Sequence, residues 1–205
     1  LLRIVRREAR IRIYGIHQHE AAPRDAVSRD AYLDALVDVV VAKYAPLPAA
    51  GLSYVVRRLR YAAPQWQGQL GRALTRAKHR LAHARVDGVD WYWPAASVVL
   101  GHEVDDQVRL LAPFDPVVWD RRRFELLWGW AYRFEAYTPV PKRKLGYYAL
   151  PLLWGDRVIG WANVSVNGKA LKADVGYVGS SPRGRVFRRA LREELVRFRR
   201  FPGLL

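Results

Sequence analysis

Two short turn sequences, Gly155-Asp156 and Asn167-Gly168, divide the apolar stretch from residue 146 to residue 178. Glycine beside Asp or Asn is typical of two-residue hairpin turns, because glycine adopts left-handed backbone angles without strain. The runs around these turns are rich in Val, Ile, Tyr and Trp, which favour strands. The stretch therefore predicts two or three antiparallel strands that form a compact β domain.

A helical region is predicted before this β domain. Apolar residues recur at three- and four-residue spacing from Ser28 to Tyr44, and Ser28 can cap the N-terminus of that helix. Prolines and a glycine then interrupt the chain, and a second, shorter helix is predicted over residues 52–62. Before the first helix, Ile11 and Ile13 fit a short alternating strand, while residues 1–8 fit either a strand or a helix.

A third helix is predicted from about Trp66 to His83. At 100° per residue its polar side gathers donors and no acidic residue; its members are Gln69, Arg72, Arg76, His79 and His83. A hairpin around Asp87-Gly88 follows. This order is typical of a winged helix-turn-helix, whose last helix lies in the DNA major groove. The alternative is a basic face that only contacts water.

Three adjacent cations, Lys142, Arg143 and Lys144, lie between aromatic runs that look β-like. We expect residues 131–137 to form a strand and the cations to project from a basic β-hairpin that binds phosphate. Tyr147 is a further candidate contact, although at least one of Tyr147 and Tyr148 is expected in the core. Asp115 or Asp120 is expected to cap a short helix that Gly129 ends.

The last segment, residues 181–205, predicts a basic amphipathic helix capped by Ser181. Its apolar stripe packs inward, and the remaining positions are largely arginine. That arginine face either contacts water or binds phosphate, and a membrane surface is a third, weaker alternative.

The charge balance points to an anionic partner. The formal net charge is +16, from 35 Lys and Arg against 19 Asp and Glu, which favours nucleic acid over a small-metabolite substrate. No apolar run approaches the roughly 18 residues that span a bilayer. The chain has no cysteine, so disulfides and thiolate metal sites are excluded. We expect a cytoplasmic monomer, and the absence of Met suggests part of a longer reading frame.

Two polar clusters resemble metal ligands but lack the spacing of a metal motif. One contains His17, His19 and Glu20, and is interpreted as a polar connector; the other contains Glu103, Asp105 and Asp106, and is interpreted as a solvated turn. We therefore expect neither a metal nor a cofactor.

Six blocks in the stretch from Leu110 to Asn163 occur in a recognisable order. They are Pro113–Asp115, Trp119–Arg121, Tyr132–Glu135, Lys142 with Arg143, Gly146–Pro151 and Gly155–Gly160. This pattern resembles the C-terminal signature of the winged-helix DNA glycosylase family, the YcaQ/AlkZ-like proteins, and the likeness covers most of residues 9–178. Trp161 and Ala162 depart from it, since they replace an expected basic residue and its neighbour.

The resemblance implies tandem winged-helix motifs, a β-barrel-like C-terminal domain and a concave DNA-binding face. It also implies metal-free excision of alkylated or crosslinked bases. The family's catalytic pair, Gln followed two residues later by Gln or Asp, belongs to an N-terminal lobe that we expect this chain to lack. Gln65 and Gln67 have that spacing but lie at the start of the third predicted helix.

The sequence as a whole predicts an α+β protein: a winged helix-turn-helix, then a small antiparallel, barrel-like β domain and a basic C-terminal helix. The expected divisions are residues 1–22, 23–95, 96–180 and 181–205. We expect the chain to be the DNA-binding portion of a repair glycosylase on double-stranded DNA, with contacts from Gln69, Arg72, Arg76, His79, Lys142, Arg143, Lys144 and Tyr147. The alternatives are a non-enzymatic winged-helix regulator and an RNA-binding module.

Overall fold

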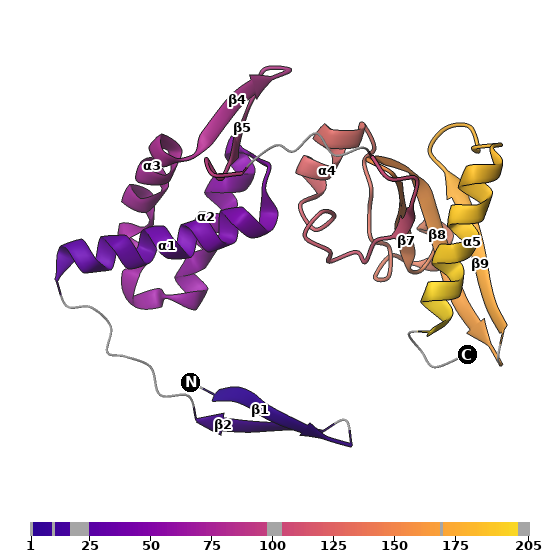
Figure 1. Ribbon diagram of the computed structural model, residues 1–205, viewed down its shortest axis with the longest axis horizontal. Coiled ribbons are helices and arrows are strands. Elements are labelled where there is room, and N and C mark those ends of the chain that lie inside the picture. The colour runs from indigo at the N-terminus through magenta and orange to yellow at the C-terminus, as the bar shows by residue number, and fades with distance from the viewer. Residues whose placement is uncertain (1, 10, 17–24, 98–103, 169, 201–205) are drawn as a thin grey trace.

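A computed structural model describes residues 2–9, 11–16, 25–97, 104–168 and 170–200 of the 205. Its helices and antiparallel sheets confirm the α+β class. Figure 1 shows three parts: an N-terminal hairpin, a helical body formed by residues 26–93, and a sheet body formed by the described residues from 104 to 200.

The N-terminal hairpin consists of β1 (Leu2–Glu8) and β2 (Ile11–Ile16), which pair antiparallel. The strand predicted around Ile11 is therefore confirmed, and the residues before it are also a strand. Figure 1 shows this hairpin apart from the helical and sheet bodies. Its apolar residues are exposed accordingly, including Ile11 and Ile16.

The helical body contains three helices packed around one core. In chain order its elements are α1 (Ala26–Tyr44), β3 (Leu47–Pro48), α2 (Ala49–Ala62), the 3₁₀ helix η1 (Pro64–Gln69), α3 (Leu70–Arg80), β4 (Ala82–Val86) and β5 (Val89–Trp93). Fully buried side chains from all three helices meet in the core, among them Leu33, Val56 and Ala73. Asp25 caps α1, because its carboxylate accepts a hydrogen bond from the Ser28 backbone N–H at 2.7 Å. The prediction of Ser28 as the cap was wrong.

The third helix is shorter than predicted. Residues 64–69 form the tighter η1 turn after Pro64, and α3 ends at Arg80 because Leu81 is extended. His83 therefore lies on β4 and not on the helix. The hairpin is confirmed: Asp87 and Gly88 form its turn with φ angles of 50° and 77°. The strands of this body pair in the order β3-β5-β4.

The sheet body confirms the antiparallel β domain. Its open sheet pairs β6 (Val108–Leu110), β7 (Ala149–Trp154), β8 (Arg157–Asn167) and β9 (Ala170–Tyr177) in that order. The Gly155-Asp156 turn is as predicted. Asn167 was predicted in the second turn but belongs to β8, where it pairs with Ala170 of β9.

One helix packs on each face of this sheet. Phe124 of α4 (Arg121–Trp128) packs with Val158, and Phe187 of α5 (Arg185–Arg200) packs with Leu152. Asp120 caps α4 and Gly129 ends it with φ 66°, as predicted. The Ser181 cap was wrong, since α5 begins at Arg185.

The strand predicted over residues 131–137 does not form, so the basic β-hairpin was also wrong. This segment is irregular, and Lys142 ends a short 3₁₀ turn, η2 (Val140–Lys142). Hydrogen bonds to other segments hold it in place. The Tyr132 hydroxyl donates to the Ala149 carbonyl at 2.7 Å, and buried Glu135 accepts hydrogen bonds from the chain that returns toward β7. The buried positions of this segment, Tyr132 and Glu135, are three residues apart and do not follow the alternation of a strand.

Arg123 joins the helical body to the sheet body. Its side chain is only 3% exposed and donates to the carbonyls of Tyr44, at the end of α1, and Pro116. Burial lowers the pKa of this guanidinium, which still stays protonated. Beside it, the Trp119 ring packs against Tyr44 and Tyr54, with centroid distances of 5.0 and 5.6 Å.

We expect Arg123→Lys to lower the free energy of unfolding by about 1–3 kcal/mol, because one ammonium group leaves a buried carbonyl unpaired. Urea unfolding measures the change. The matched control is Arg122→Lys at the exposed neighbouring position, with an expected change within about 0.5 kcal/mol. Equal effects of the two substitutions would contradict a special role for Arg123.

Candidate nucleic-acid interface

Ion pairs fix α3 on α1. Arg76 binds Asp30 at 3.1 Å and Asp34 at 3.0 Å, and Arg80 binds Asp34 at 2.9 Å and Asp38 at 2.8 Å. The expected cationic stripe on α3 is therefore not continuous, because the charge of Arg76 is turned toward α1. The signal was present in the sequence: aspartates recur every four residues on α1, as the two arginines do on α3.

The outer face of α3 carries fewer cations than expected but is open. Arg72 and His79 are exposed on it, as predicted. At Gly68 and Gly71 nothing lies within 4 Å of the position that a Cβ would take. A flat partner can therefore approach the backbone closely at this end of the helix.

The glutamines of this region have different surroundings. Gln65 and Gln67 are exposed on η1, on either side of buried Trp66. Gln69 is half-buried at the start of α3, and its side-chain oxygen is buried without a hydrogen-bond partner in the protein. His83, on β4, stacks on Tyr92 at 5.7 Å.

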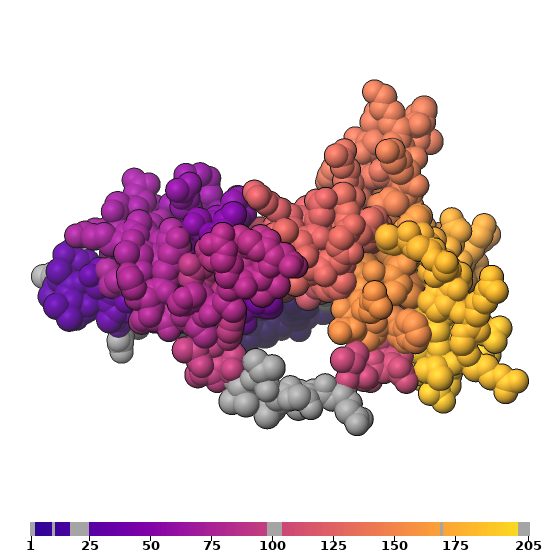
Figure 2. All heavy atoms as spheres, turned by 90° about the horizontal axis from the view of Figure 1, so that it is seen from above, coloured from indigo at the N-terminus to yellow at the C-terminus, as the bar shows by residue number. Residues whose placement is uncertain are grey.

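The second group of predicted contacts lies on residues 136–148, which we call the cationic loop. The side chains of Lys142 and Lys144 are exposed on this loop. Arg143 lies between them, donates from Nε to the Thr138 carbonyl at 2.8 Å and covers the ring of Tyr147 at 5.0 Å. Figure 2 shows the part of the chain around residue 140 projecting from the molecular surface.

Two side chains hold the base of the cationic loop. One oxygen of Glu135 accepts the backbone N–H groups of Lys144 at 2.8 Å and Leu145 at 2.7 Å. Asn163 on β8 donates to the Leu145 carbonyl at 2.7 Å and accepts from the Tyr148 N–H at 3.3 Å. These bonds order a loop that has no strand pairing of its own. Sequence analysis did not identify Asn163.

Tyr147 and Tyr148 both lie outside the core, with exposed fractions of 60% and 44%. The expectation that at least one of them is buried was wrong. The cationic loop therefore combines exposed aromatic rings with exposed cations.

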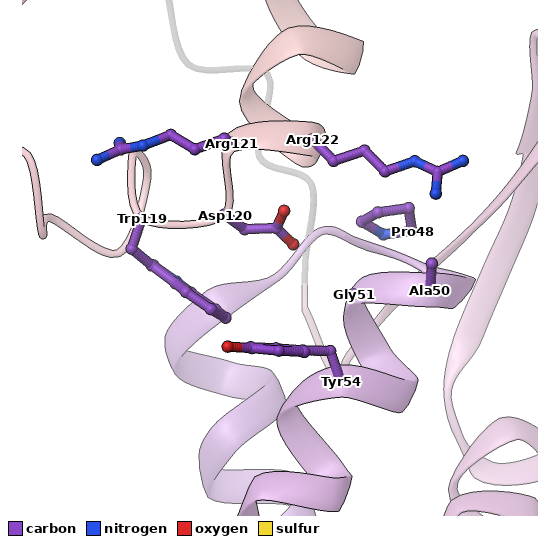
Figure 3. Close-up of a pocket in the computed structure, with 8 residues that line it drawn as sticks. All are labelled: Pro48, Ala50, Gly51, Tyr54, Trp119, Asp120, Arg121 and Arg122. Carbon is purple, nitrogen blue, oxygen red and sulfur yellow. The ribbon is translucent and has the colours of Figure 1, made fainter. Parts of the chain in front are cut away.

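A small cavity of about 290 Å³ lies where the two bodies meet (Figure 3). Trp119 and Tyr54 line it and are in direct contact, so no planar group fits between their rings. Figure 3 shows Arg121 and Arg122 directed to opposite sides. Arg121 donates to the carbonyls of Val118 and Pro113 and covers the Tyr132 ring at 4.5 Å. Because of these contacts, we interpret the cavity as part of the packing between the helical body and the sheet body.

Within the described residues, no cluster of His, Asp or Glu is arranged to hold a metal ion. His17, His19, Glu20 and Glu103 lie outside those residues. Asp105 accepts the backbone N–H of Gln107 at 3.1 Å. No helix in the described part of the chain has the length and apolar content to cross a membrane.

Tyr132, which supports the cationic loop, should make the free energy of unfolding depend on pH. Burial raises the pKa of its hydroxyl from 10.0 to about 12. The folded protein therefore holds this proton more tightly than the unfolded chain. This difference stabilises the folded protein. Its contribution to the free energy of unfolding is complete below pH 10 and is lost as the pH rises through about 12.

Between pH 9 and pH 12, we expect the free energy of unfolding of the wild type to fall by up to about 2 kcal/mol more than that of Tyr132→Phe. Urea unfolding across that range measures the difference, and the variant corrects for other groups that titrate. Parallel pH profiles for the two proteins would contradict the raised pKa.

Comparison with known protein families returned a match over almost the whole chain. The family model, described as DNA glycosylase AlkZ-like, matches residues 1–201. The match includes the N-terminal hairpin, the helical body and the sheet body. No solved structure matches the chain.

Proposed function

The chain belongs to the AlkZ-like DNA glycosylase family, and on that basis we propose that it holds double-stranded DNA for a repair glycosylase acting on alkylated or crosslinked bases. The observation that carries this proposal is the cationic loop: two exposed lysines and Arg143, on a loop ordered by Glu135 and Asn163. Ordered cations bind phosphate with little loss of conformational freedom.

We further propose that the helical body is a winged helix-turn-helix. Its element order supports this, since a short β3 lies between α1 and α2 and the β4-β5 hairpin follows α3. The sheet order β3-β5-β4 places the first strand beside the last, with β4-β5 as the wing. In this arrangement α3 enters the major groove.

We assign the DNA contacts on α3 from the exposure of its side chains. Arg72 and His79 face outward and would donate to DNA, whereas Arg76 would orient α3 through its ion pairs with Asp30 and Asp34. Gln69 lies at the N-terminal end of α3, the end that reaches base edges in such motifs.

The hydrolytic step is not assigned to Gln65 and Gln67. Excision needs an extruded base enclosed in a pocket, with an amide or carboxylate that positions water against the sugar. Both glutamines are exposed on η1, so water would surround a base placed there. We propose instead that this region holds DNA. We also propose that the protein acts as a monomer.

We expect Lys142→Ala combined with Lys144→Ala to weaken binding to a paired DNA duplex about tenfold and to reduce the slope of log affinity against log salt by about 2, because each lysine contacts a phosphate. Fluorescence anisotropy between low and moderate salt measures both quantities. Arg157→Ala with Lys172→Ala removes the same charge from exposed positions on β8 and β9. An equal loss of duplex affinity in this control variant would show that binding depends on net charge alone and not on the cationic loop.

A second prediction concerns the open face of α3. Gly71→Gln adds a side chain where no neighbour lies within 4 Å, so the fold should be kept or stabilised by about 0.5–1 kcal/mol. Duplex affinity should nevertheless fall about tenfold, since the side chain fills the space that the groove needs. Thermal unfolding and anisotropy give the two readings. Gly184→Gln, at an equally open position before α5, should leave binding unchanged, and unchanged binding of Gly71→Gln would contradict the placement of α3.

A further inference from the structure

An exposed aromatic cluster lies partly on the cationic loop and partly on the segments next to it, and phosphate binding assigns it no role. Phe134 is at its centre and makes edge-to-face contacts with Phe114 at 5.5 Å, Tyr137 at 6.2 Å and Tyr148 at 5.1 Å. We call these four residues the aromatic platform. Phe114 is 70% exposed and Tyr137 92% exposed, so most of their ring surface faces water.

Such exposure is unusual for rings that the fold could bury, and clustered exposed apolar groups mark binding sites. The platform is also ordered: Phe134 lies between the two residues, Tyr132 and Glu135, that anchor this segment to Ala149 and Leu145. The rings are therefore presented to solvent by a support that does not need to rearrange.

Charge indicates what the platform binds. Within residues 131–148 the sole carboxylate is that of Glu135, which is buried and bonded to two backbone N–H groups, whereas Arg133, Lys142 and Lys144 are exposed. Asp115, next to Phe114, is half-buried and accepts the Val117 backbone N–H at 2.8 Å. Aromatic rings among cations, with no fully exposed acid, match a ligand that combines flat apolar faces with negative charge. Single-stranded nucleic acid has both, because its bases stack on aromatic rings while its phosphates contact the cations.

A fully paired duplex cannot use the platform. Its phosphates reach the cations, but its bases are stacked on one another and offer no free face. A duplex with unpaired nucleotides offers both. Extrusion of a base for repair also leaves its opposite nucleotide without a partner.

We propose that the aromatic platform and the cationic loop together bind unpaired nucleotides beside a duplex, with bases stacked on Tyr137 and Phe114. This inference rests on the proposed DNA-holding function and adds a preference among DNA structures. A stacked base contributes enough affinity to predict binding about tenfold tighter for a duplex with a bulge than for a paired duplex.

The test compares a paired duplex with the same duplex carrying a three-nucleotide bulge, by anisotropy at one salt concentration. A second reading uses 2-aminopurine in the bulge, whose fluorescence is quenched when it stacks on a ring. The wild type should prefer the bulged duplex about tenfold and quench the probe.

Tyr137→Ala combined with Phe114→Ala should remove the preference and the quenching while the affinity for paired duplex stays the same. Both side chains are largely exposed, so thermal unfolding should match the wild type. The matched control is Tyr14→Ala, an exposed tyrosine on β2, which should retain preference and quenching.

The outcomes separate the two proposals. Salt-dependent binding with equal affinity for both DNAs would overturn the role of the platform and leave the DNA-holding function standing. A preference that survives the double substitution would also overturn it, as would binding to neutral lipid vesicles or to a protein in place of the bulged DNA. Absence of binding to either DNA would overturn the DNA-holding function itself.

Discussion

The arrangement of this protein depends on a buried guanidinium that is bonded to main-chain oxygens. Arg123 connects the end of α1 to the segment before α4, and its charge is balanced only at longer range by Asp115 and Asp120. Removing such a group from water is costly, and its buried Nε has no hydrogen-bond partner, so both carbonyls that accept from its terminal nitrogens have to stay in place. The Trp119 ring closes the same joint. The orientation of α3 relative to the cationic loop follows from these contacts.

Many residues in the family blocks make hydrogen bonds to the backbone and thereby support the fold. Asp115 accepts the Val117 N–H, Arg121 binds two carbonyls and the Tyr132 ring, and Glu135 holds the cationic loop. Polar side chains that satisfy buried backbone groups tolerate few substitutions. A sequence pattern of this kind can therefore identify a family through its scaffold while saying little about which exposed residues meet the ligand.

Sequence reasoning succeeded where a local rule determines structure. The Asp87-Gly88 and Gly155-Asp156 turns, the Asp120 cap and the Gly129 helix end all depend on neighbouring residues. It failed where distant residues decide. Residues 131–137 alternate like a strand in sequence, but their conformation is set by Tyr132 and Glu135, which bond to partners more than eight positions away. The ion pairs of Arg76 were not predicted, because its acidic partners lie on another helix, and Asp34 is 42 positions away.

The close packing of Gly146 on Asn163 makes two positions that are distant in the sequence depend on each other. Gly146 has φ 112°, and a Cβ there would lie 2.5 Å from the Asn163 amide, which holds both Leu145 and Tyr148. A side chain at 146 would displace the amide, and loss of the amide would release the loop that needs the glycine. A substitution at either position therefore disturbs the contact made by the other, so the two positions act as one structural unit.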